Sequence, residues 1–198
     1  MKKLILLLFI TLLVACGSVT YEESGISENE DYSTFEKVKD GNIEFRIPEG
    51  FKLEDSFEGR SVMRSYQISK KPISPTLVYI TVDKLDSVEA AQTAVASRHK
   101  EFEDHEQIKK TIEAELFEYG YKRIVTSNLK QHRYLIGDKD LHNTTVIIET
   151  YPDKFAYSFY FFNMGSEFIQ ARLMSFEKDF KRDDLNLRRI IDTIKISE

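Results

Sequence analysis

The chain has 198 residues, a length that suits one domain together with a leader and a linker. Its formal net charge of −5 at pH 7 argues against a nucleic-acid-binding surface, which needs a clustered basic face, and against a polybasic membrane anchor. Cys16 is the only cysteine, which excludes an internal disulfide and a CxxC redox pair.

The first residues contain the three parts of a secretory signal. Lys2 and Lys3 form a charged start, residues 4–14 are an almost unbroken apolar run, and small residues follow it. The run is too short for a permanent membrane-spanning helix. The sequence therefore predicts that the chain is exported.

The last residues of this signal resemble a bacterial lipobox, the motif at which a signal is cleaved and the new N-terminal cysteine is lipidated. Leu13, Val14, Ala15 and Cys16 match every place of that motif. The resemblance implies that residues 1–15 are a lipoprotein signal peptide and that Cys16 carries a diacylglycerol thioether with fatty-acyl chains such as palmitate. Two or more chains give stable anchoring. The alternative is an ordinary secretory signal that ends near a free thiol.

A lipidated Cys16 implies a location on the extracytoplasmic side of a bacterial membrane. Loss of residues 1–15, whose only charges are Lys2 and Lys3, would change the net charge from −5 to −7. In a cell with two membranes, Gly17 after the cysteine resembles the signal for the outer one. We therefore expect a cell-envelope protein that is anchored to a membrane without spanning it.

Residues 16–40 are predicted to be a flexible acidic tether. Acidic residues lie there among Ser, Thr, Gly and Asn, and no apolar periodicity is present. Such a tether would extend and lift the domain clear of the headgroups. The alternative is a short recognition segment that becomes ordered on a partner.

The single domain is predicted over 41–198, and it opens with strands. Apolar and charged residues alternate over 43–47, and Pro48-Glu49-Gly50 then predicts a turn. Further strands are predicted at 62–69 and at 77–82, the latter apolar on both faces and so covered on both sides.

A helical region follows these strands. Asp86 is the expected N-cap, and Glu89 completes a capping-box pattern. Apolar residues recur at helical spacing to about residue 118. However, the apolar face of the first half does not continue into the apolar face of the second half. We therefore expect two helices with a break near Asp104 and His105 rather than one long helix.

Strand signals return after Gly120. They cover 121–127, 132–137, 144–151 and 155–162, with a hairpin turn at 152–154. In the last strand Tyr157, Phe159 and Phe161 share one face, and we expect helices to cover both faces.

Two helical elements are predicted at the end of the chain. One is a helix or helical turn over 165–180, and the other is a short amphipathic element over 187–194 that leads into an edge strand at 193–196. This order of strands, helix, strands and helix predicts an α+β fold with an antiparallel β-sheet flanked by helices.

Three segments of the domain resemble the PsbP-like α/β/α sandwich proteins, and bacterial DcrB-like lipoproteins are similar. The segments are IEFRIPEGF at 43–51, SVEAA at 87–91 and IIDTIKI at 190–196. The resemblance implies an α/β/α sandwich. It also implies an accessory role, because members of this group mostly assist or bind larger assemblies and share no catalytic residues.

The residues themselves give no strong catalytic signal. His99 and Glu103 would share a helix face, but a metal site needs a further ligand and no spacing supplies one. No Gly-x-Ser-x-Gly elbow and no phosphate-binding glycine loop is present in the sequence. We therefore expect no enzymatic activity, no metal and no cofactor.

Two functions remain in view from the sequence. The first is a non-enzymatic envelope lipoprotein that acts as an accessory or assembly subunit, with an envelope protein as partner and no nucleic acid. The second is a binding module that holds a small apolar ligand, lipid or peptide in a sheet–helix cleft, with Tyr157, Phe159 and Phe161 as candidate lining residues. An envelope hydrolase is a third possibility.

Overall fold

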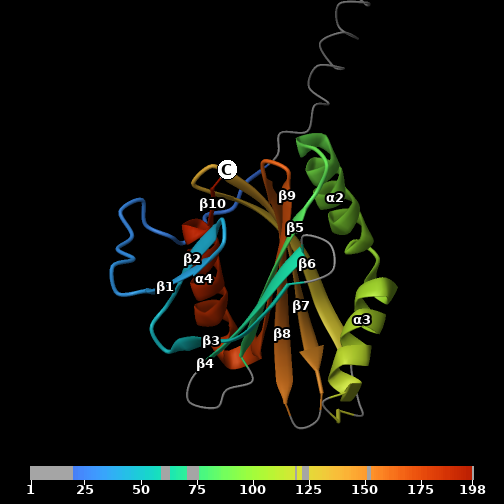
Figure 1. Ribbon diagram of the computed structural model, residues 1–198. Helices are drawn as coiled ribbons and strands as arrows, with labels where there is room; N and C mark the ends of the chain where they lie inside the picture. Colours follow the sequence, from blue (N-terminus) through green and yellow to red (C-terminus); the bar gives the residue numbers. More distant parts are fainter. Residues whose placement is uncertain are drawn as a thin grey trace, which may run out of the picture.

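The computed structural model describes residues 20–58, 63–70, 76–118, 120–121, 125–150 and 153–197. The predicted signal peptide and Cys16 lie outside these residues. A large antiparallel sheet forms the middle layer (Figure 1). Its strands are β3 (Phe51–Glu58), β4 (Met63–Lys70), β5 (Leu77–Lys84), β6 (Val125–Ile136), β7 (Lys139–Glu149), β8 (Lys154–Met164) and β9 (Glu167–Phe176).

The seven strands lie in the order β3-β4-β5-β9-β8-β7-β6. Every neighbouring pair is antiparallel. Two-residue turns join β6 to β7 and β8 to β9, and each begins with a glycine at positive φ, Gly137 at 59° and Gly165 at 60°. Glycine adopts this backbone conformation without the steric cost that a side chain would bring.

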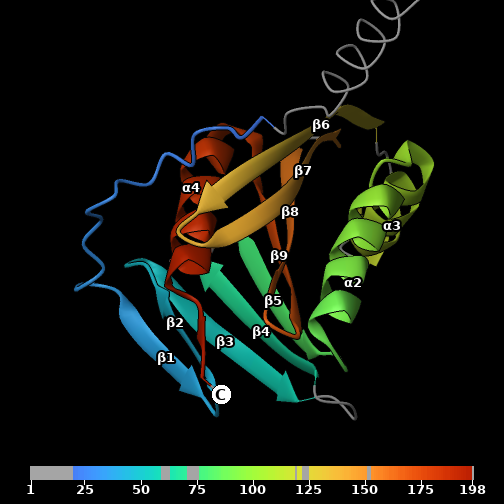
Figure 2. The same cartoon turned by 90° about the horizontal axis from the view of Figure 1, so that it is seen from above.

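Helices cover both faces of this sheet (Figure 2). Helices α2 (Val88–Glu101) and α3 (His105–Glu118) lie on one face. Helix α4 (Glu177–Thr193) lies on the other face, together with a small sheet of three strands in the order β1-β2-β10. These strands are β1 (Glu36–Asp40), β2 (Ile43–Ile47) and β10 (Lys195–Ile196). The predicted α+β fold, an antiparallel sheet flanked by helices, is therefore confirmed.

Strand β8 lies at the centre of two apolar clusters, because its side chains are buried on both faces from Phe155 to Phe162. On one face Tyr160 and Phe162 pack with residues of α4 such as Leu187 and Ile190. On the other face the cluster contains four aromatic residues of β8 and the apolar residues of α2 and α3. Each helix buries an apolar stripe that could not remain exposed without cost.

The break between α2 and α3 is confirmed, and its cause is local. The carboxylate of Asp104 accepts hydrogen bonds from the backbone N–H groups of Glu106, at 2.9 Å, and Gln107, at 3.3 Å. Asp104 therefore caps the start of α3. At the start of α2, however, the cap is Ser87, whose hydroxyl accepts from Ala90 N at 3.1 Å, so the prediction of Asp86 was wrong by one residue.

The predicted helix at 165–180 was wrong, since this segment forms strand β9 and the first turn of α4. Ile169, Ala171 and Leu173 are buried on one face, and Gln170 and Arg172 are partly buried on the other. This is the period of a strand. The spacing of Phe168, Leu173 and Phe176 resembles a helix by coincidence.

Three other strand predictions need correction. Residues 51–58 form β3, which was not predicted. The strands expected at 121–127 and 132–137 are one strand, β6, with an irregular register between Ser127 and Lys130. In β5 one face is fully buried and the other only partly, so the strand is not covered equally on both sides.

The predicted tether also differs from the structure. Residues 36–40 form β1 and pair with β2, from Glu36 opposite Ile47 to Asp40 opposite Ile43. The folded region therefore begins before residue 41. Residues 20–35, which we call the N-terminal strap, have no helix or extended strand but make specific contacts with the domain, described below.

The packing of α4 predicts the effect of shortening one of its buried residues. Ile190 is fully buried against the sheet, and Ile190→Ala should lower the free energy of unfolding by about 2–5 kcal/mol, because it removes apolar contact and leaves a cavity. Lys181→Ala, at an exposed position of the same helix, is the matched control. Urea denaturation measures both, and equal losses would contradict this packing.

Candidate functional site

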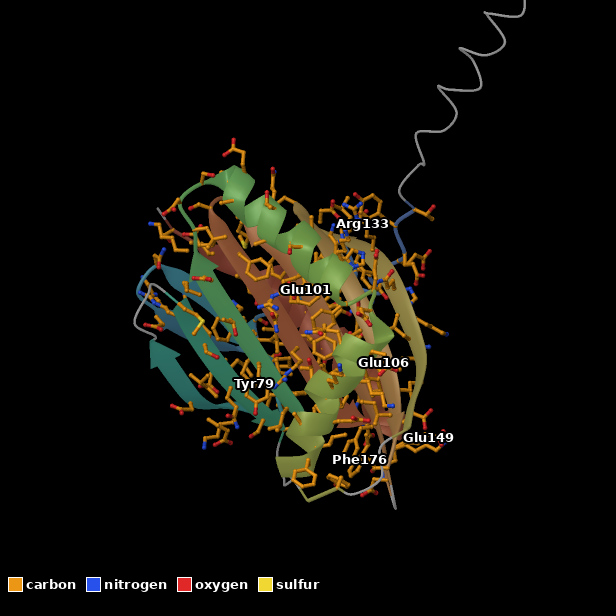
Figure 3. All side chains as sticks on the ribbon, turned by 90° about the vertical axis from the view of Figure 1, so that its right-hand side faces the viewer. Tyr79, Glu101, Glu106, Arg133, Glu149 and Phe176 are labelled. Atoms are coloured by element: carbon orange, nitrogen blue, oxygen red, sulfur yellow. The ribbon has the colours of Figure 1, made fainter. Side chains whose placement is uncertain are left out.

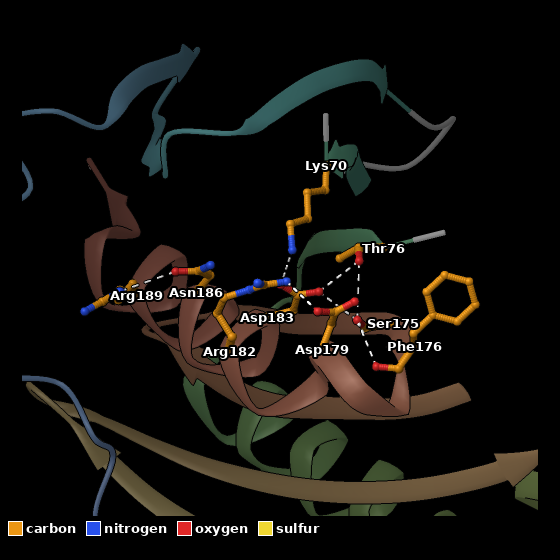
Figure 4. Close-up of polar contacts among 9 residues, drawn as sticks. All are labelled: Lys70, Thr76, Ser175, Phe176, Asp179, Arg182, Asp183, Asn186 and Arg189. Atoms are coloured by element: carbon orange, nitrogen blue, oxygen red, sulfur yellow. Dashed lines mark hydrogen bonds and ion pairs between the residues drawn. The ribbon is translucent and has the colours of Figure 1, made fainter. Parts of the chain in front are cut away.

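Helix α4 carries two adjacent buried aspartates, which are the strongest candidates for acid–base chemistry. Asp183 Oδ1 accepts from Lys70 Nζ at 2.7 Å, and its Oδ2 accepts from Thr76 Oγ1 at 2.9 Å and Ser175 Oγ at 2.7 Å (Figure 4). Arg182 Nε lies 3.3 Å from Oδ1. These contacts link the first turns of α4 to β4, to Thr76 just before β5, and to β9.

The chemistry of Asp183 indicates a structural clamp. Burial alone would raise the pKa of this carboxyl, but the hydrogen bonds from Lys70, Ser175 and Thr76 outweigh burial and lower the pKa. The carboxylate is therefore ionised, and both hydroxyl groups donate to it. Ser175 is itself fully buried, so its hydroxyl is not accessible as a nucleophile.

Asp184 faces a different part of the core. Its two carboxylate oxygens accept from Tyr160 Oη at 2.9 and 3.0 Å, and Arg188 Nη2 lies 3.2 Å from Oδ2. Burial raises the pKa of Asp184, and Arg188 opposes this effect. Burial and the Asp184 charge raise the pKa of Tyr160. This buried triad joins α4 to the central strand β8.

Arg188 also begins a second set of contacts, which hold the N-terminal strap. Its guanidinium donates to the carbonyl oxygen of Ser24. Arg189 forms an ion pair with Glu30 at 2.7 Å, and Tyr32 Oη donates to Asp192 Oδ2 at 2.5 Å. The last turns of α4 therefore bind the strap along its length.

The start of the strap lies against the edge strand β6. Glu22 N donates to Arg133 O at 2.8 Å, and the Glu22 carboxylate lies 2.5 Å from His132 Nδ1. The Tyr21 ring lies under the Arg133 guanidinium, with 5.6 Å from Cζ to the ring centroid, and Tyr21 Oη donates to Asp140 at 3.2 Å. Residues 20–35 are thus bound to the domain at both ends and in the middle.

Two clefts open at the end of the sheet where the strap starts. The first, which we call the sheet-end cleft, has a volume of about 980 Å³ and lies between the β5–α2 link, the two glycine turns and β10. Its charged lining residues include Lys84, Glu89, Asp138, Lys139 and Glu167. This cleft is polar and carries both signs of charge.

The second, the strap cleft, has a volume of about 610 Å³ and lies between the strap, the end of β6 and the end of α4. Its lining combines carboxylates, at Glu22, Glu23, Glu28 and Asp192, with the apolar side chain of Leu135. The β6–β7 turn borders both clefts, because Gly137 lines this one and Asp138 lines the first. We call this end of the domain the anchor end.

A pair of histidines lies between α2 and β7. The rings of His99 and His142 are in edge contact, with centroids 4.6 Å apart, and the Nδ1 atom of each is buried without a hydrogen-bond partner. Burial is the main cause that lowers both pKa values, and Arg133 adds to it. The pKa of His142 is about 4. The pair is therefore neutral at pH 7.

The sequence did not indicate that these two histidines are in contact, because His99 and His142 are far apart in the chain. The predicted pairing of His99 with Glu103 does not make a metal site. Among the described residues, no group of three or more His, Cys, Asp or Glu side chains could hold a metal ion. Arg133 beside the histidines would also repel a cation.

Tyr157, Phe159 and Phe161 are core residues rather than a surface. Their exposed fractions are 0%, 2% and 0%. Phe159 borders a cavity of about 140 Å³, which Arg98, Glu101 and Arg172 also line. Most ligand pockets have volumes of about 300–1,000 Å³. The prediction that several of these rings line an open cleft is therefore not met.

Two comparisons of the sequence with known proteins found no match. No protein-family profile matches the chain. No curated protein matches its sequence. Within the part of the chain that the structure describes, no helix is long and apolar enough to cross a membrane.

Several solved structures are similar in shape. The cyanobacterial PsbP (CyanoP) of Synechocystis sp. PCC 6803 is 9% identical, with 87% of this chain and 98% of that chain covered and a TM-score of 0.49. LpqN, involved in cell envelope biogenesis of Mycobacterium tuberculosis, is 11% identical, with 81% and 90% covered and a TM-score of 0.43.

A third similar structure, from Bacteroides thetaiotaomicron, is 9% identical, with 79% of this chain covered and a TM-score of 0.47. The chain spans 46% of that protein's length. All three TM-scores are below 0.5, so our fold assignment rests on the strand order and register given above.

The clamp at Asp183 predicts a stability effect. Asp183→Asn should lower the free energy of unfolding by about 1–3 kcal/mol, because it removes the charge that Lys70, Thr76 and Ser175 are arranged to bind. Asp179→Asn removes a more exposed ion pair with Arg182 on the same helix. It should lower the free energy of unfolding by at most about 1 kcal/mol. Denaturant unfolding tests the ranking, and a larger cost for Asp179→Asn would refute it.

The histidine pair predicts a dependence of stability on pH. Because folding lowers both pKa values, the unfolded chain binds more protons below the ordinary value of 6.5. The contribution of the pair to the free energy of unfolding is therefore present above pH 6.5. It is lost as the pH falls towards the pKa of folded His142, about 4. Urea unfolding across this range should show a smaller loss for the double variant His99→Leu, His142→Leu than for the native chain. Identical pH profiles would contradict this account.

Proposed function

We propose that this protein is a lipid-anchored accessory subunit of the bacterial cell envelope. It acts by contacts with an envelope protein, on the extracytoplasmic side of a membrane, and without catalysis. The anchor is Cys16, and in a cell with two membranes the anchored membrane is the outer one. The proposal rests on the lipobox at 13–16 and on the position of the strap.

The strap is the observation that carries the proposal. Only four residues lie between Cys16 and Tyr21, a distance of five residue steps, and at Tyr21 the chain is already bound to β6 and β7. A fully extended chain spans at most about 3.6 Å per residue, so Tyr21 would lie within about 18 Å of the lipidated cysteine. The anchor end and both of its clefts would then be available to a partner at the membrane surface.

The buried polar groups support a role without catalysis. Asp183 and Asp184 each have their hydrogen-bonding capacity used by neighbouring groups, and they fix α4 to the sheet. The open clefts, by contrast, carry mixed polar and charged side chains on turns and element ends. Such surfaces on a rigid scaffold suit protein contacts.

Crosslinking of intact cells followed by affinity capture tests this proposal. We expect the native protein to capture an envelope protein, and the Cys16→Ser variant to lose most of it, because that variant is not held at the membrane. Exposed charge reversals at the sheet-end cleft, such as Asp138→Lys, should weaken capture, while Lys154→Glu at the opposite end of the sheet should not. Absence of any partner for the native protein would refute an accessory role.

A further inference from the structure

The anchor end of the domain gathers exposed apolar side chains. Among the described residues, the large hydrophobic side chains with high exposure are Tyr21 at 42%, Val88 at 45%, Leu135 at 53% and Phe117 at 74%. Tyr21 contacts Arg133 and Asp140, Val88 lines the sheet-end cleft and Leu135 lines the strap cleft. Three of the four therefore lie at the anchor end.

Figure 3 shows the two ends of the sheet. Arg133, against which Tyr21 packs, lies beside the segment that leads back to residue 20, whereas Glu149 and Phe176 lie at the other end. The C-terminal part of α3, which carries Phe117, also lies towards that other end (Figure 1). Phe117 is thus an exposed apolar side chain far from the strap.

The length of chain before the strap limits where the anchor end can lie. A strap bound by Arg133, Arg188 and Arg189 cannot act as a long tether. The five residue steps from Cys16 to Tyr21 span at most about 18 Å. By comparison, β8 has 11 residues, so the sheet itself is roughly 35 Å long. The opposite end of the sheet therefore lies farther from Tyr21 than Cys16 can.

The charge of the anchor end indicates which lipids it can approach. Asp138 is 90% exposed, and the Glu22 and Asp140 side chains are 53% and 42% exposed. Glu22 pairs with His132 and Asp140 with Arg133, whereas among the described residues Asp138 has Lys139 as its one ion-pair partner, at 3.7 Å. This acidic rim would be repelled by an anionic surface and not by a zwitterionic one.

We propose that the anchor end docks on the lipid surface, with Tyr21, Val88 and Leu135 as its contacts to zwitterionic headgroups. This inference rests on the proposed lipid anchor at Cys16. Tyrosine is enriched at membrane–water interfaces, and apolar side chains gain from leaving water. The strap sets the orientation, because it holds the anchored start of the chain against β6 and α4.

The chain contains no tryptophan, so single tryptophans can report the orientation without background from other indoles. The probes are Leu135→Trp and Val88→Trp at the anchor end, with Phe117→Trp as the matched exposed control. Each full-length protein is expressed so that it is processed and lipidated. It is then reconstituted into phosphatidylcholine vesicles that contain a lipid with a nitroxide on its headgroup.

We expect the nitroxide to quench the Leu135→Trp and Val88→Trp signals several-fold more than the Phe117→Trp signal. Vesicles rich in phosphatidylglycerol should reduce this difference at low salt, and about 0.15 M salt should restore it by screening. Equal quenching of the three probes, or no quenching of any, would overturn the proposal. Quenching that appears only after an envelope membrane protein is added would also overturn it, since the docking surface would then be that protein.

The mass of the N-terminal peptide is measured first on the same samples. A lipidated peptide with unselective quenching would refute only the docking proposal. A peptide that lacks lipid would refute the proposed anchor and with it the accessory function. The two failures are therefore distinguishable.

Discussion

The burial of β8 on both faces is the constraint on which the rest of the structure depends. A strand whose residues 155–162 are all buried cannot face water on either side, so one layer of structure must cover each face. Helix α4 and the small sheet cover one face, and α2 and α3 cover the other. Helix α4 packs against this core, so the two carboxylates that it buries there need hydrogen-bond or ion-pair partners. Asp183 and Asp184 meet this requirement through Lys70, Thr76, Ser175, Tyr160 and Arg188.

The same arrangement concentrates accessible features at one end of the molecule. The two glycine turns, the β5–α2 link and the strap meet there, and the backbone N–H of Leu85 joins the link to Ser166 O at 3.0 Å. The side chains of β8 are packed into the core, and the cavity beside Phe159 is only about 140 Å³, smaller than most ligand pockets. Recognition by this protein is therefore best sought on the anchor end. A lipid at Cys16 would hold that end near a membrane, and this single geometry underlies both the accessory role and the proposed docking.

Local patterns in the sequence predicted much of the fold. Two strands were predicted correctly, β2 from the alternation of Ile43, Phe45 and Ile47, and β8 from its aromatic residues. The apolar residues at helical spacing up to residue 118 correctly predicted two helices with a break between them. Strand β9 was mistaken for a helix because apolar residues lie on both faces of a central strand and can mimic a helical period. The strap was mistaken for a free tether because its contacts join residues far apart in sequence, such as Tyr32 to Asp192. The histidine pair escaped detection for the same reason, since the ring contact between His99 and His142 exists only after α2 packs on the sheet.

Mass spectrometry of the mature N-terminus tests the central claim most directly. The protein is expressed in a lipoprotein-processing bacterium, extracted from its membranes and digested, and the peptide that contains Cys16 is identified. The account predicts that residues 1–15 are absent and that the peptide begins at Cys16 with the added mass of a diacylglyceryl group, with or without a further acyl chain. A peptide that begins elsewhere, or one that begins at Cys16 with an unmodified thiol, would contradict the account.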